Sequence, residues 1–155
     1  MAEAVSSTSQ AIAKPEPVLR ASEDAAVEEI VRIHNTEPQR FEQELQWTAI
    51  GVANAKERYA NPAAPLRFTH SAEGSYRMSA SGPPYWVIPF PGLVLDKSRY
   101  GLGAMGEVFI CPNYKPGSRY RKITLVRPAR FRLSADGFEL ESPGELQLDA
   151  PEPDN

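Results

Sequence analysis

The sequence predicts an α+β protein that is mainly β, with short N-terminal helices followed by a small antiparallel SH3-like barrel or sandwich. Two observations predict this class. Fifteen prolines among 155 residues argue against long helices, because each proline removes a backbone donor and clashes with the preceding turn. From residue 61 onward, short strand-like runs alternate with turns rich in Gly and Pro. Many short strands at regular spacing are typical of a closed or sandwiched antiparallel sheet.

The first part of the chain is predicted to contain a tail and two helices. Residues 1–21 are rich in Ala, Ser and Glu, so we expect a disordered tail with too little apolar area to become ordered. A helix is expected to begin at Ser22, a suitable N-cap, and to end at Asn35. A short second helical turn is expected to hold Phe41 after Pro38.

The hydrophobic period changes to two from Leu45, so Leu45, Trp47 and Ala49 are expected on one face of a strand. A brief helix is expected at 54–60 before the remaining runs begin. Between those runs lie turn sequences such as AEG, SGPP and SPG. The runs are LRFTH (66–70), SYRMSA (75–80), YWVIPF (85–90), GEVFIC (106–111), RKITLV (121–126), ARFRLS (129–134), FELE (138–141) and ELQL (145–148).

The length suits a single domain, which we expect over residues 22–148. Within it, residues 22–60 are expected to be mostly helical and residues 61–148 rich in β-structure. The final segment DAPEPDN, residues 149–155, has the composition of a disordered acidic tail.

Composition excludes several classes of function. A net charge of −3 gives no global reason to expect nucleic acid or an anionic membrane as a partner. The one cysteine, Cys111, has no second cysteine for an internal disulfide and no thiolate companion for a metal site. No apolar run approaches the ~18 residues of a membrane span, and the first residues do not read as a secretory signal. We therefore expect a cytoplasmic protein without cofactors.

One glycine-rich segment, YGLGAMGEVF at 100–109, suggests a phosphate-binding loop. As a dinucleotide fingerprint it fails, because a strand-like run rather than a helix follows it, and no acidic residue occurs between Glu107 and Asp136. It also resembles the glycine-rich loop of protein kinases, but the chain has no His-Arg-Asp and no Asp-Phe-Gly motif. We expect no bound nucleotide, and a mobile hairpin turn whose glycines take positive φ.

Several short motifs follow one another in a fixed order. They are IHNTEPQRF (33–41), YWVIP (85–89), EVFICPNY (107–114), LVRPA (125–129) and PGELQL (143–148). Together they resemble an uncharacterised cyanobacterial protein family with a Tyr-Trp-hydrophobic-Pro strand, a Phe-x-Cys-x-x-Tyr strand and a Leu-x-x-Pro-Ala-like strand. The resemblance implies a small C-terminal β-rich domain with no established activity. This chain departs from the pattern in lacking a long coiled coil and in carrying Arg127 where lysine is expected.

The clearest charge pattern lies in the second half of the chain. Seven basic residues and no acid occur in 108–135, and seven acidic residues and no base occur in 136–155. We name residues 115–132 the basic strip. Alternation in ARFRLS is expected to point Phe131 and Leu133 toward a core and Arg130 and Arg132 outward. Either the strip is an electropositive surface with stacking tyrosines, or the acidic strands lie beside it and neutralise it, which we favour.

The candidate binding residues come from this strip and from one aromatic pair. In the strip they are Tyr114, Arg119, Tyr120, Arg121, Arg130 and Arg132, and in the pair Tyr85 and Trp86. Core packing is the favoured role of Trp86, although nearby prolines at 83, 84, 89 and 91 suit a peptide groove. Cys111 is expected to be a small core residue, and the two histidines, His34 and His70, have no companions at ligand spacing, so no metal is expected.

These observations favour a non-enzymatic protein-interaction or scaffold module. No combination of acid, base and nucleophile stands out. The alternative is a small-barrel RNA- or DNA-binding protein that uses the basic strip.

Overall fold

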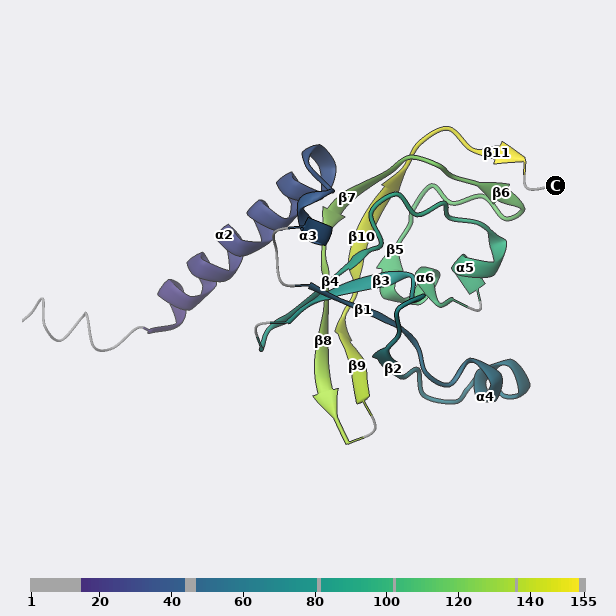
Figure 1. The fold of residues 1–155 in the computed structure, drawn as a ribbon, viewed down its shortest axis with the longest axis horizontal. Coiled ribbons are helices and arrows are strands. Elements are labelled where there is room, and N and C mark those ends of the chain that lie inside the picture. Colours follow the sequence, from purple (N-terminus) through teal and green to yellow (C-terminus); the bar gives the residue numbers. More distant parts are fainter. Residues whose placement is uncertain (1–14, 44–46, 81, 102, 136, 154–155) are drawn as a thin grey trace, which may run out of the picture.

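The computed structural model describes residues 15–43, 47–80, 82–101, 103–135 and 137–153. Six strands form a closed antiparallel barrel in the order β1-β2-β9-β8-β4-β3, which confirms the predicted class (Figure 1). Their bounds are β1 Trp47–Val52, β2 Phe68–His70, β3 Tyr76–Ser79, β4 Tyr85–Pro89, β8 Ala129–Ser134 and β9 Gly137–Ser142. Closing the sheet pairs the edges that an open sheet leaves exposed.

Aromatic side chains fill the barrel. Phe68 is fully buried, its ring centroid 4.5 Å from that of Phe131 and 5.6 Å from that of Tyr76. The ring is closed where β2 meets β9, through a single residue pair, Phe68 with Phe138. An ion pair of 2.7 Å between Arg67 and Glu139 crosses the same junction.

A second sheet of three strands lies beside the barrel, in the order β5-β10-β7. Its strands are β5 Phe109–Ile110, β7 Ile123–Arg127 and β10 Gly144–Leu148, with β10 parallel to β5 and antiparallel to β7. A further two-stranded sheet joins β6 Ser118–Arg119 to β11 Glu152–Pro153. The helices are α2 Pro15–Thr36, α3 Arg40–Gln43, α4 Ala55–Ala60, α5 Lys97–Gly101 and α6 Met105–Val108.

Two asparagine side chains extend the three-stranded sheet on its two sides. Asn35 in the last turn of α2 donates to the Leu125 carbonyl at 2.9 Å and accepts from the Leu125 N–H at 2.8 Å, so its amide pairs with the outer edge of β7. Asn113, after β5, makes the same pair of bonds to the backbone of Leu148 in β10. A primary amide carries the donor and the acceptor of a peptide unit, so each side chain takes the place of a neighbouring strand.

Helix α2 is longer than predicted. It begins at Pro15 rather than at the expected Ser22, and its N-terminal part projects away from the barrel (Figure 1). Its C-terminal part packs on β7 through Ile30 and Ile33, both buried. Asn35 was expected to end the helix, but it lies within it and pairs with β7 instead. The tail was predicted over residues 1–21, of which 15–21 belong to α2, while residues 1–14 and Leu45 lie outside the described residues.

Three further expectations are wrong. The run 106–111 is not one strand, because α6 occupies Met105–Val108 before the short β5. The C-terminal residues at 152–153 form β11, although we expected a solvated tail. Leu133 is 64% exposed rather than in the core, because β4 begins at Tyr85, opposite Phe131, so Leu133 lies beyond the end of the neighbouring strand.

Within the described part of the chain, no helix combines the length and the apolar character that crossing a lipid bilayer demands.

Replacing Asn35 by Ala is expected to lower the free energy of unfolding by about 2 kcal/mol, because it leaves the buried Leu125 backbone without partners. Asn35→Asp is expected to destabilise as well, since a carboxylate oxygen would then face the Leu125 carbonyl. Urea denaturation followed by circular dichroism measures both. Glu28→Ala on the exposed side of the same helix is the control, expected within about 0.5 kcal/mol of the parent. An Asn35→Ala chain as stable as that control would contradict the role assigned to the amide.

Candidate functional site

The arginines of the basic strip are paired with the acidic residues that follow them in sequence. Arg130 approaches Glu141 at 3.6 Å and Arg132 approaches Glu139 at 3.2 Å across the β8–β9 hairpin. Three more arginines bind acidic residues of β10 and β11: Arg127 with Glu145, and Arg119 and Arg121 with Glu152. The structure therefore agrees with the favoured interpretation, in which acidic residues on neighbouring strands neutralise the basic strip.

The eight candidate residues lie on two different parts of the fold. Tyr85 and Trp86 in β4 pair with β8, which carries Arg130 and Arg132. Both aromatic rings are half-buried: Tyr85 packs edge-on against Phe138, and the Arg130 guanidinium lies 5.4 Å from the Trp86 ring centroid. The other four, Tyr114, Arg119, Tyr120 and Arg121, lie in and around β6. Tyr120 is buried, and its hydroxyl accepts from the Lys115 N–H and donates to the Asn113 carbonyl.

The described residues of the glycine-rich segment contact other parts of the fold. The Tyr76 hydroxyl, from the barrel, donates to the Gly103 carbonyl. Gly106 lies against the ring of Tyr100, which in turn stacks on Tyr114 with ring centroids 3.6 Å apart. None of Gly101, Gly103 and Gly106 has positive φ, whereas Ala104, at φ 65°, is left-handed among the residues of the segment that the structure describes. Gly103 and Gly106 provide room for close packing, which corrects the expected hairpin turn.

The remaining chemical candidates sit in surroundings that suit packing. Burial raises the pKa of the Cys111 thiol to about 11, so little of it is thiolate near neutral pH. Among the residues that the structure describes, no three His, Cys, Asp or Glu side chains come together as metal ligands. Burial also raises the pKa of Tyr76.

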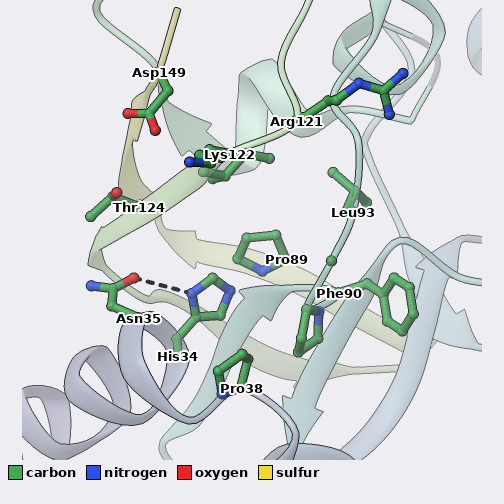
Figure 2. A pocket seen from close by; sticks show the side chains of 13 residues that line it. His34, Asn35, Pro38, Pro89, Phe90, Leu93, Arg121, Lys122, Thr124 and Asp149 are labelled. Carbon is green, nitrogen blue, oxygen red and sulfur yellow. Dashed lines mark hydrogen bonds between the residues drawn. The ribbon is translucent and has the colours of Figure 1, made fainter.

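A cleft of about 310 Å³ lies where three remote segments meet (Figure 2). The end of α2 contributes His34 and Asn35. The last residue of β4 and the segment after it contribute residues 89–93, and the start of β7 with the residues before it contributes 121–124. Pro38 and Asp149 complete the lining. Its volume is at the lower end of the range of small-ligand pockets.

His34 forms an apolar part of the wall of this cleft. Since the Leu125 backbone fixes the orientation of the Asn35 amide, the His34 Nδ1–H donates to Asn35 Oδ1 at 3.3 Å (Figure 2). Its Nε2 is buried and makes no hydrogen bond. Burial lowers the pKa of His34, while Asn35 and the Pro89 carbonyl oppose this; the carbonyl acts as a nearby dipole that favours the protonated ring.

The mouth of the cleft is polar. Lys122, Thr124 and Asp149 are exposed, and their side chains point to the same side in Figure 2. Arg121, also at the mouth, binds Glu152 at 3.1 Å. Among the described residues, Lys122 makes no ion pair, in contrast to the arginines of the strip.

Sequence reasoning did not find this cleft. Of the eight candidates only Arg121 lines it, and Tyr85 and Trp86 do not; of the four prolines considered for a groove, Pro89 and Pro91 line it. The missed residues are His34, Asn35, Lys122, Thr124 and Asp149. His34 recurs at helical spacing with apolar residues, which signals burial but does not separate a core histidine from one beside a cleft.

No known protein family, curated protein or solved structure matches this chain.

The packing role of the glycine-rich segment is testable with two alanine variants. A Cβ at Gly106 would lie 2.6 Å from Cζ of Tyr100, whereas a Cβ at Gly101 would meet nothing within 4 Å. We expect Gly106→Ala to cost about 1–3 kcal/mol of unfolding free energy, and Gly101→Ala to change it by less than about 0.5 kcal/mol. Equal stability of the two variants in thermal or urea unfolding would show that the Tyr100 ring does not depend on Gly106.

The burial of His34 predicts a pH dependence of stability. The folded-state pKa lies below the unfolded value of 6.5, so the unfolded chain binds more protons as the pH falls below 6.5. Stability contributed by the neutral ring is therefore complete above that pH and is lost as the pH falls through it. We expect the urea midpoint to drop less between pH 7.5 and pH 5 in His34→Gln than in the parent chain. Identical drops would contradict burial of the imidazole.

Proposed function

We propose that this chain is a non-enzymatic protein-interaction or scaffold module, built on an SH3-like barrel and acting in the cytoplasm, whose binding face is the cleft beside α2. The observation that carries the proposal is the cleft itself, which has a half-apolar lining and a lysine at its mouth that makes no ion pair among the described residues. A half-apolar hollow with a few polar groups at its edge suits an inserted side chain of a partner protein.

The groups with catalytic potential support a binding role. Cys111 is a poor nucleophile because burial raises its pKa to about 11. His34 directs one ring nitrogen to Asn35, and burial keeps its ring neutral. The resemblance to the uncharacterised cyanobacterial family, with its lack of established activity, agrees with this proposal.

The alternative, RNA or DNA binding by the basic strip, is less well supported. It depends on Arg119, Arg121, Arg130 and Arg132, and each of these has an acidic partner within the chain. Phosphates would have to displace those carboxylates before they could release counterions. Filter binding at low salt that exceeds an acidic control protein would favour this alternative.

The proposal predicts that Lys122→Glu weakens a partner that binds at the cleft. Lys115→Glu is the matched control, because Lys115 is also an exposed lysine of the strip without an ion pair among the described residues, but it does not line the cleft. A partner captured from the native host and cross-linked to residues 89–93 is expected to bind Lys122→Glu at least about tenfold more weakly, measured by biolayer interferometry. Equal weakening by both variants would contradict binding at the cleft.

A further inference from the structure

The outer edge of β6 is occupied by the chain's own acidic end. In β11, Glu152 pairs with Arg119 and Pro153 with Ser118, antiparallel to β6. The Glu152 Oε1 lies 3.1 Å from Arg121 Nε and 3.5 Å from Arg119 Nη2. This contact is an extended acidic segment bound to a basic strand edge.

The β6 side of this contact is held rigidly from behind. Tyr120 directly follows β6, and its N–H and carbonyl exchange two hydrogen bonds with Leu95, at 2.8 and 2.9 Å. Both residues are buried, and the Tyr120 hydroxyl makes two further hydrogen bonds. The strand edge is therefore already in place before any segment adds to it, which lowers the entropic cost of adding one.

The covering segment, residues 150–153, is held much more weakly. Ala150 and Pro151 are exposed, and the ladder consists of the two residue pairs of β11. A proline in a strand cannot donate a ladder hydrogen bond. The strongest contact of the covering segment is made by the Glu152 carboxylate. Its ion pairs join side chains that are 34–57% exposed, so they contribute little to the stability of the contact.

Arg119 is incompletely satisfied by the covering segment. Its Nε is buried and has no hydrogen-bond partner, and the 3.5 Å contact of its Nη2 with Glu152 is longer than a charged hydrogen bond. One carboxylate oxygen serves two arginines, so neither guanidinium has a bidentate partner. A carboxylate placed differently on the same edge would meet donors that the covering segment leaves unused.

We propose that the edge of β6 is a strand-addition site for an extended acidic segment of a partner protein, and that residues 150–153 occupy it in the unbound chain. Backbone pairing with β6 supplies the binding, and Arg119 and Arg121 select an acidic side chain. A second hollow, lined by Arg121, Lys122, Asp149, Ala150 and Glu152, shares its first three residues with the cleft, so release of the covering segment joins the two sites. This inference rests on the proposed function and names its class of partner.

The test uses the full chain and a synthetic peptide of its own last residues, DAPEPDN, added in trans and followed by ¹⁵N NMR. In the parent chain the tethered segment competes at a high effective concentration. Glu152→Lys places a cation beside Arg119 and Arg121 and is expected to release the segment. The peptide is then expected to bind at least about tenfold more tightly than to the parent, with shifts at residues 118–121. Glu145→Lys, which breaks the pair with Arg127, is the control of equal charge change.

Two further measurements separate the outcomes. The peptide DAPQPDN, and the double variant Glu152→Lys with Arg119→Ala, are each expected to remove the gain. If Glu152→Lys loses its dispersed spectrum, Glu152→Gln replaces it.

Equal affinity of the peptide for Glu152→Lys and Glu145→Lys, or shifts away from β6, would overturn the inference. Dimers of the Glu152→Lys chain in light scattering would overturn it too, since the segment would then be exchanged between copies. A partner that is sensitive to Lys122→Glu would still support the proposed function.

Discussion

The pairing of the Asn35 amide with Leu125 is the interaction on which the arrangement of this protein depends. The outer edge of β7 offers a backbone donor and acceptor that are buried at Leu125, and such groups are costly when left unpaired. Because the partner is a side chain of α2, the same two hydrogen bonds dock the helix and orient its last turn. His34, one residue earlier, is thereby set into the wall of the cleft. Asn113 makes the corresponding pairing with Leu148 in β10.

Much of the fold was predictable from the spacing of apolar residues along the sequence. The run ARFRLS has the bounds of β8, and YWVIPF and ELQL each differ from β4 and β10 by one residue at an end. Leu133 is exposed although it lies on the predicted face, because alternation reports which face a residue is on, not whether another element covers that face. The hydrophobic period also failed to predict the structure after residue 100, where Gly103 and Gly106 leave room for the Arg99 backbone and the Tyr100 ring just upstream.

The candidate site was predictable only in its charges. The separation of basic and acidic residues along the chain anticipated the ion pairs of β8 with β9, since consecutive antiparallel strands become neighbours. It also anticipated the pair of Arg127 in β7 with Glu145 in β10, although β8 and β9 lie between these two strands in sequence. The charge pattern did not predict β11, because composition alone does not reveal that Glu152 pairs with Arg119. The cleft joins residues near 34, 90 and 122, and no local pattern links positions so far apart. Lys122 stands apart from the strip's arginines by lacking an ion pair among the described residues, which the sequence did not reveal.

The junction between β2 and β9 has a consequence for how the barrel assembles. The strand pairs β3–β4 and β8–β9 join neighbouring parts of the chain, whereas Arg67 and Glu139 at this junction are 72 positions apart. A contact between such distant positions carries a loop-closure cost that local hairpins do not. One residue pair and one ion pair provide little to offset that cost until the neighbouring strands are already aligned. From these separations we expect the curled sheet to close last at this junction, where Phe68 completes both the ring and its core.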